Sequence, residues 1–160
     1  MKHKIFIWII AGFFACIGTI SAQTGRNMEK QNKAIIEQAF QEWATGKGNV
    51  FDLLDDHVEW TITGTCAISK VYTSSKQFID EAIIPLNKRF KVKIAPKIRN
   101  IYADGNTVIV IWDGKAMATD GLPYNNTYSW YMTMKDGRIV KAIAFFDTIE
   151  LDAIWNRIKI

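Results

Sequence analysis

One carboxylate near the end of the chain is well placed for acid–base chemistry. The stretch FFDTIELDAIW, residues 145–155, puts Asp147 directly after two phenylalanine rings and before a run with helical spacing. Apolar walls favour the proton-carrying form of a carboxyl group, which suits general acid–base catalysis. An aspartate in front of a helix is also a good cap, because it accepts hydrogen bonds from the first backbone amides. Asp147 is therefore predicted to be either a catalytic residue or a structural cap.

Aromatic residues in predicted strands and in one loop form the candidate substrate-binding set. Rings give a large contact area at small entropic cost, so they line pockets for flat apolar ligands. The set consists of Trp60, Tyr72, Trp112, Tyr128, Trp130 and Phe146. Core packing or a subunit interface is the alternative for each of them, although at least two are expected in a pocket. Tyr72 could close over the opening or pack on the helix that follows it.

The remaining residue types predict no metal site, no cofactor and no nucleic-acid partner. After the first 22 residues the chain has one histidine, His57, and one cysteine, Cys66, too far apart for a metal-ligand set. Glycine-rich phosphate loops and Ser-His-Asp arrangements are absent from the sequence. No lysine and arginine cluster is interleaved with aromatics, as a nucleic-acid track would require. Cys66 is interpreted as structural, and His57, in the turn before the first strand, as solvated.

The first 22 residues have the pattern of a secretory signal. Two lysines precede an apolar run over residues 5–20, and small residues at positions 21 and 22 suit cleavage after Ala22. Cleavage would lower the net charge from +4 to +2 and leave one domain, residues 23–160, in the periplasm or secreted from a bacterium, with no membrane contact. An uncleaved anchor is the alternative, although the run falls short of the roughly 20 apolar residues of a membrane-spanning helix.

Hydrophobic spacing predicts the elements that must position these residues. Of the 160 residues 49% are hydrophobic, which fits one globular domain with a filled core. After a polar link over residues 23–28, apolar residues at three- and four-residue spacings predict a helix over residues 29–48. A short helix over residues 49–57 follows, capped by Asn49. Residues 58–64 alternate as a strand does, with Trp60 on the apolar face.

The rest of the chain is predicted to form a helix, a group of strands and a last helix. Residues 74–90 have a helical period, capped by Ser74 or Ser75, and Pro85 should kink or split that helix. Strands separated by Asp-Gly turns follow up to Asp147, because glycine accepts a positive φ at tight turns. Thr148 is predicted to cap the closing helix. Helices in one block and antiparallel strands in another define the α+β class.

This order and several local strings resemble the nuclear transport factor 2-like superfamily, and within it the SnoaL-like, ketosteroid-isomerase-related group. The strings are DDHVEWTITGT (residues 55–65), NIYADGNTVIVIW (100–112), DGLPYNNTYSWYMTMKDGRIV (120–140) and AFFDTIEL (144–151). The resemblance implies a cone-shaped, strongly curved antiparallel sheet wrapped around the N-terminal helices, a cystatin-like roll whose open end leads to an apolar pocket. It also implies a homodimer formed through the outer sheet face.

The resemblance also assigns a role to Asp147. SnoaL-like cyclases end their closing strand in an aromatic residue followed by Asp-Thr, and that aspartate faces the pocket as the acid/base residue; residues 146–148 match this pattern. The other residue sets of this fold are incomplete here. Residues 60–62 offer no carboxylate where ketosteroid isomerases carry their base, and Ile111 stands before Asp113 where epoxide hydrolases have an arginine.

The sequence thus predicts an exported SnoaL-like protein that binds a small apolar molecule in a conical pocket, with a carbonyl group on that molecule as an option. Acid/base chemistry of isomerase, cyclase or lyase type through Asp147, without a cofactor, is a further option. The alternative is a non-catalytic homodimeric interaction module whose cavity is filled by its own side chains.

Overall fold

The computed structural model describes residues 11–160, with side chains from residue 23 onward. Its first element, α1 (Ala11–Thr45), is one continuous helix, so the polar link predicted over residues 23–28 is wrong. Polar residues without a proline continue a helix readily, and the single Gly25 does not end it. Of the predicted signal segment, residues 1–10 lie outside the described part of the chain, and its cleavage stays a prediction. Among the described residues, no helix is both long and apolar enough to cross a bilayer.

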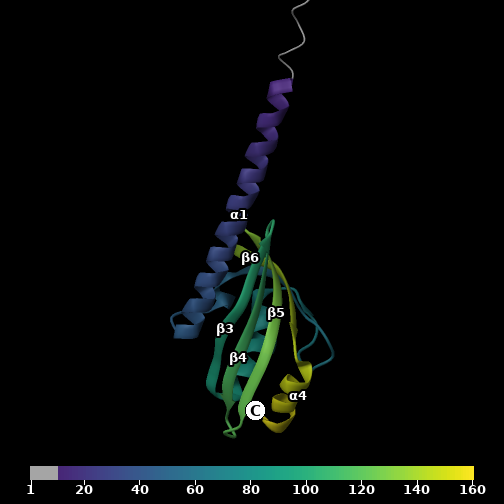
Figure 1. The fold of residues 1–160 in the computed structure, drawn as a ribbon. Helices are drawn as coiled ribbons and strands as arrows, with labels where there is room; N and C mark the ends of the chain where they lie inside the picture. The colour runs from purple at the N-terminus through teal and green to yellow at the C-terminus, as the bar shows by residue number, and fades with distance from the viewer. Residues whose placement is uncertain (1–10) are drawn as a thin grey trace, which may run out of the picture.

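The C-terminal part of α1 packs on the sheet, while its N-terminal part projects beyond it (Figure 1). Ile36, Ala39 and Phe40 are buried on one side of this helix, as their three- and four-residue spacing predicts. These three side chains are among the residues that cover the concave face of the sheet.

The segment after α1 turns sharply into the first strand. A short 3-10 helix, η1 (Val50–Leu53), is capped by Asn49, whose side-chain oxygen accepts a hydrogen bond from the Phe51 amide at 2.7 Å. The strand β1 (Leu54–Ile62) begins at once, so the helix predicted to reach residue 57 is four residues too long. Leu54 is buried and pairs with Ile139 across the sheet, and the pairing register shifts between Leu54 and Glu59. A two-residue strand, β2 (Val71–Tyr72), pairs antiparallel with β1 and was not predicted.

The helix predicted over residues 74–90, which Pro85 was expected to kink or split, changes type before Pro85 but runs on without a break in the helical backbone. An α-helical turn, α2 (Ser75–Phe78), leads into a π-helical segment, η2 (Ile79–Ile83), and then into α3 (Ile84–Lys88). Proline has no backbone N–H to donate, so the regular hydrogen-bond ladder is interrupted where it enters. Ser74 caps α2, since its hydroxyl accepts a hydrogen bond from the Gln77 amide at 3.1 Å.

Four long strands and a last helix complete the fold. The strands are β3 (Phe90–Asp104), β4 (Thr107–Ala118), β5 (Pro123–Lys135) and β6 (Arg138–Phe146), and the helix is α4 (Thr148–Arg157). Their turns use glycines at positive φ, as the Asp-Gly pairs predicted, at Gly105, Gly121 and Gly137. The sheet order is β2-β1-β6-β5-β4-β3. Because β1 runs parallel to β6, the sheet is mixed rather than antiparallel throughout.

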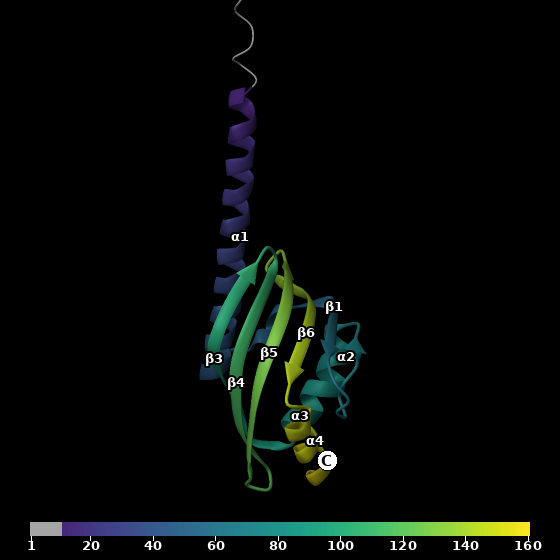
Figure 2. The ribbon, with the colours of Figure 1, turned by 45° about the vertical axis from the view of Figure 1, so that its right-hand side comes forward.

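The result is an α+β fold in which a curved, unclosed sheet bends around the helices, as predicted. Figure 2 shows α3 and α4 at the lower end of the sheet and α1 along the side of β3. In β4 and β5 the even-numbered residues face inward and are buried, except for the partly buried Ala116, while their odd-numbered neighbours face outward. This alternation decides which side chains reach the interior.

Candidate functional site

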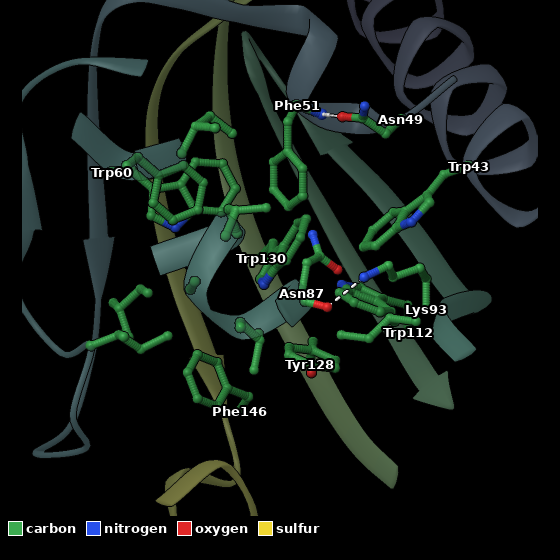
Figure 3. A pocket seen from close by; sticks show the side chains of 18 of the residues that line it. Trp43, Asn49, Phe51, Trp60, Asn87, Lys93, Trp112, Tyr128, Trp130 and Phe146 are labelled. Carbon is green, nitrogen blue, oxygen red and sulfur yellow. Dashed lines mark hydrogen bonds between the residues drawn. The ribbon is translucent and has the colours of Figure 1, made fainter. Parts of the chain in front are cut away.

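A cavity of about 610 Å³ lies between the concave face of the sheet and the helices that cover it (Figure 3). Its walls come from the end of α1, from η1, from α2, η2 and α3, and from five strands and α4. Most of the lining side chains are aromatic or aliphatic. The volume falls within the range of about 300–1,000 Å³ that is common for small-molecule sites.

Five of the six predicted substrate-binding residues line this cavity. They are Trp60, Trp112, Tyr128, Trp130 and Phe146. Strand register brings them together, because Trp112 stands opposite Tyr128 and Tyr128 opposite Phe146 in neighbouring strands. The rings of Trp112 and Tyr128 stack with centroids 3.9 Å apart, and Trp60 meets Trp130 edge-on at 5.1 Å.

Tyr72 is the sixth predicted residue, and it does not line the cavity. Its side chain is only 1% exposed, and its ring packs edge-on against Phe78. Its hydroxyl donates to the carbonyl oxygen of Ile68 at 2.7 Å, and burial raises the pKa of this phenol to about 12. Tyr72 therefore packs on α2, the second of its two expected roles, and does not close the opening.

Sequence reasoning missed several lining residues. Trp43 on α1 and Phe51 on η1 both contribute rings, with centroids 5.6 Å apart. Phe78 stacks on Trp60 at 4.5 Å. The helical spacing showed that these residues face the interior, but it could not distinguish a cavity wall from a filled core.

Three indole N–H groups in the cavity wall have no acceptor. The Nε1 atoms of Trp60, Trp112 and Trp130 are buried and lack a hydrogen-bond partner, while the three side chains are at most 5% exposed. A buried donor without an acceptor costs roughly 1–3 kcal/mol. Because these nitrogen atoms are covered by neighbouring side chains, a ligand oxygen could reach them only after those side chains shift.

A fourth donor lies near α4, at the deep end of the cavity. The hydroxyls of Tyr124 and Tyr128 are 3.0 Å apart, and the Asn126 side-chain amide donates to Tyr124 at 3.1 Å. Burial raises the pKa of both tyrosines, and that of Tyr128 most strongly, so both hydroxyls keep their protons at neutral pH. One hydroxyl proton forms the hydrogen bond between the two tyrosines, and the proton of the other hydroxyl can be donated to a different acceptor. When Tyr124 donates to Tyr128, the Tyr128 hydroxyl can donate to a ligand.

Asp147 is the N-cap of α4. Its Oδ1 accepts hydrogen bonds from the amides of Ile149 at 2.9 Å and Glu150 at 3.4 Å. The side chain is exposed and does not line the cavity. Of the two roles predicted for Asp147, the structure therefore shows the cap, and the expectation that its carboxylate faces the pocket is corrected. The cap predicted at Thr148 lies one residue too late.

Two physical reasons explain this placement of Asp147. The inward residues near the end of β6 are even-numbered, ending with Phe146 in the cavity wall, so the next side chain leaves that face. The Asn126 side chain then fixes the backbone of Asp147, accepting from its amide at 2.9 Å and donating to its carbonyl at 2.8 Å. The free amides of α4 attract the carboxylate.

Few charged groups reach the cavity. Asp52 lines it, but both carboxylate oxygens accept hydrogen bonds from Asn49, at 3.0 Å from its backbone amide and 3.2 Å from its side chain. Lys93 stands at the mouth, where its ammonium group donates to the carbonyl of Asn87 (Figure 3). The interior of the cavity thus presents donors and no free carboxylate.

The other residues weighed in the sequence lie away from the cavity. His57 is exposed on β1. Asp113 points outward, where it binds Arg99 at 2.7 Å and Thr127 at 2.7 Å. Cys66 is buried, with its Sγ 3.1 Å from the Ser69 hydroxyl. Within the part of the chain that the structure describes, no group of His, Cys, Asp and Glu side chains could hold a metal ion.

The fold is that of nuclear transport factor 2-like proteins, and the solved structures that share it include SnoaL-like members. A nuclear transport factor 2-like protein from Burkholderia thailandensis E264 superposes with a TM-score of 0.64 at 15% sequence identity, over 78% of this chain and 96% of that chain. A protein assigned to the SnoaL-like polyketide cyclases, from Jannaschia sp. CCS1, gives 0.63 at 15% identity, over 78% and 90%. A protein of cystatin-like fold from Xanthomonas campestris gives 0.65 at 17% identity, over 78% and 97%.

The predicted fold class is confirmed by these structures, whose low identities establish a shared fold and not a shared activity. No family model matches the chain, and no curated protein matches it in sequence.

Proposed function

We propose that this protein binds a flat, apolar small molecule that carries hydrogen-bond acceptors such as carbonyl oxygens. The observation that carries the proposal is the aromatic cavity with three unpartnered indole donors. Binding is favoured over catalysis through Asp147, because that carboxylate caps α4 and does not line the cavity. Isomerase or cyclase chemistry would need another proton-transfer group, and Asp52 is engaged in its own capping bonds.

The shape and chemistry of the walls define the ligand class. The rings of Trp43, Phe51 and Phe146 line the cavity and are only partly buried, so they offer surface to a planar ring system. The donors of Trp60, Trp112 and Trp130 have no acceptors, and a ligand that shifts the side chains covering them could supply one, whereas a purely aliphatic ligand could not. A site with unsatisfied donors discriminates against ligands that lack the acceptor.

A matched pair of naphthalenes tests this proposal. 2-Acetonaphthone and 2-ethylnaphthalene have the same ring and nearly the same size, but only the first has an acceptor. We expect both to raise the melting temperature of the protein in thermal unfolding followed by circular dichroism, since ligand binding to the folded state stabilises it. The ketone should bind about 2- to 12-fold more tightly, the value of one hydrogen bond. Failure of both compounds to bind would contradict the proposal.

Self-association is the second part of the proposal. The convex patch consists of Ile109, Ile111, Tyr131, Ile143 and Phe145, which face outward on adjacent strands. Tyr131 is 41% exposed and Phe145 is 45% exposed, with ring centroids 5.7 Å apart. Large apolar side chains gathered on one open face favour burial against another surface. We propose that a second copy of the chain covers this patch to form a homodimer.

Export to the periplasm or the medium is the third part. It rests on the signal pattern of residues 1–22 and on the suitability of cleavage after Ala22. An intact-mass measurement on protein recovered from the periplasm tests it, because retention of residues 1–22 would indicate the anchor instead.

The alternative function is a non-catalytic dimeric interaction module. The convex patch supports the dimeric part of that alternative. This alternative also requires a cavity filled by the protein's own side chains. A cavity of about 610 Å³ with unpartnered donors in its wall does not support that requirement. Ligand binding in the naphthalene experiment separates the two functions, since an interaction module would need no ligand.

A further inference from the structure

The cavity mouth carries one lysine whose charge is not matched by an acid. Lys93 lies near the start of β3 and lines the cavity, and its side chain is exposed. Figure 3 shows it reaching across Trp112 toward Asn87. Its ammonium group donates to the Asn87 carbonyl oxygen and lies 3.5 Å from the carbonyl oxygen of Phe90. These are neutral acceptors, so the positive charge is held in place at the mouth without being neutralised.

Three lysines in the described part of the chain, Lys70, Lys76 and Lys141, differ from Lys93 because they form ion pairs. Lys70 pairs with Glu81, and Lys141 pairs with Glu59 at 2.7 Å. No ion pair of Lys93 occurs in the described part of the chain. Asp52 is the one acid among the lining residues, and its two oxygens are occupied by Asn49.

A second polar group stands beside this ammonium group: the Asn87 side-chain amide, whose oxygen faces Lys93 in Figure 3 and whose NH2 group would face it after a half-turn of the amide. The Asn87 side chain lines the cavity and lies next to the end of the Lys93 side chain (Figure 3). Its amide makes no hydrogen bond to any residue that the structure describes. An ammonium group and a primary amide side by side can bind the two oxygens of one carboxylate, with charge assistance from the lysine.

We propose that the ligand is an amphipathic anion, with a flat apolar body inside the cavity and a carboxylate at the mouth on Lys93 and Asn87. This inference rests on the proposed function and adds the charge of the ligand and the direction in which it lies. The apolar end points toward Tyr128 and α4, and the anionic end stays close to water. The charge therefore does not have to be carried into the apolar interior, which would be costly.

The expected preference is modest because Lys93 is exposed. Ion pairs between exposed groups correspond to affinity changes of about fivefold or less. The preference should weaken as salt is raised, since exposed charges are screened over roughly 8–10 Å at physiological ionic strength.

The test compares 2-naphthoate with its neutral methyl ester by calorimetric titration of the full chain. Wild-type protein should bind the acid about two- to fivefold more tightly than the ester at low salt. Lys93→Met keeps the length of the side chain and removes the charge, so it should abolish this preference while ester binding persists. Lys91→Met is the matched control, because Lys91 is an exposed lysine of the same strand that does not line the cavity.

The outcomes separate this inference from the proposed function. Equal affinities for acid and ester in wild-type protein, or a preference that survives Lys93→Met, would overturn the anionic ligand and leave apolar binding intact. Loss of the preference in Lys91→Met would also overturn it, because a general surface charge would then be responsible. Binding of neither compound would overturn both proposals.

Discussion

The aromatic residues on the two faces of the sheet differ in their burial and in their hydrogen bonding. On the concave face Trp112 and Trp130 are almost fully buried, yet their indole N–H groups have no acceptor. On the convex face Tyr131 and Phe145 are nearly half exposed, so part of their apolar surface is in contact with water. The proposed ligand would supply polar atoms to the concave face, and the proposed second copy of the chain would cover apolar atoms on the convex face.

One strand can carry both requirements because side chains alternate. Trp130 and Tyr131 are neighbours in β5, and they point to opposite faces. The ion pairs that join sheet residues lie on the convex side, where Arg99 binds Asp113 at 2.7 Å and Lys141 binds Glu59 at 2.7 Å. A change at one position should thus affect ligand binding or association, but not both, and this separation can be tested.

The largest expected effect is a difference in stability between a substitution on the concave face and a substitution on the convex face. Trp130→Ala removes a buried ring that touches Trp60, Trp112 and Phe40, and it should lower the free energy of unfolding by about 3–5 kcal/mol. Tyr131→Ala, its neighbour on the convex face, should cost about 0.5 kcal/mol or less in dilute protein. Urea unfolding followed by circular dichroism measures both. Similar costs would mean that the convex face is buried even in the monomer.

The alternation of residues along the strands bears on two features of the structure: the concave face of the sheet and the position of Asp147. It placed Trp60 on the apolar face of its strand, and this side chain lies in the cavity wall. The same alternation, continued past Phe146, sends Asp147 out of the cavity. The resemblance to SnoaL-like cyclases favoured the pocket for Asp147, whereas the strand period and the capping rule together indicated the helix end.

The cavity itself could not be predicted, because alternation indicates the direction of a side chain and not the space beyond it. That space depends on how α1, η1 and α3 are held over the sheet. Contacts between distant residues, such as the two bonds of Asn126 to the backbone of Asp147, decide the position of α4 and leave no local pattern. Tyr72 was misplaced for a similar reason, since the two-residue strand that positions it is too short to have a detectable period.

The next effect concerns association through the convex patch. Tyr131→Lys places a charge at the centre of this surface, opposite Ile109 and Ile143, and should weaken the dimer at least tenfold, or by about 1.4 kcal/mol or more. Sedimentation equilibrium measures the dissociation constant. Asn125→Lys adds the same charge on the same face of β5 but outside the patch, so the dimer should persist. Equal weakening by both variants would place the interface elsewhere, or attribute it to net charge.

The smallest expected effect tests whether Asp147 only caps α4 or also contacts a ligand in the cavity. Asp147→Ala removes the cap of α4 and should lower the free energy of unfolding by about 1 kcal/mol, while Asp147→Asn should keep most of the stability because asparagine caps helices almost equally well. Neither variant should change the affinity for 2-acetonaphthone, because the carboxylate does not line the cavity. Parallel urea unfolding and calorimetric titration measure the two quantities. A large loss of affinity in Asp147→Asn, with stability preserved, would mean that the carboxylate reaches the bound ligand, and the catalytic role predicted from the sequence would have to be restored.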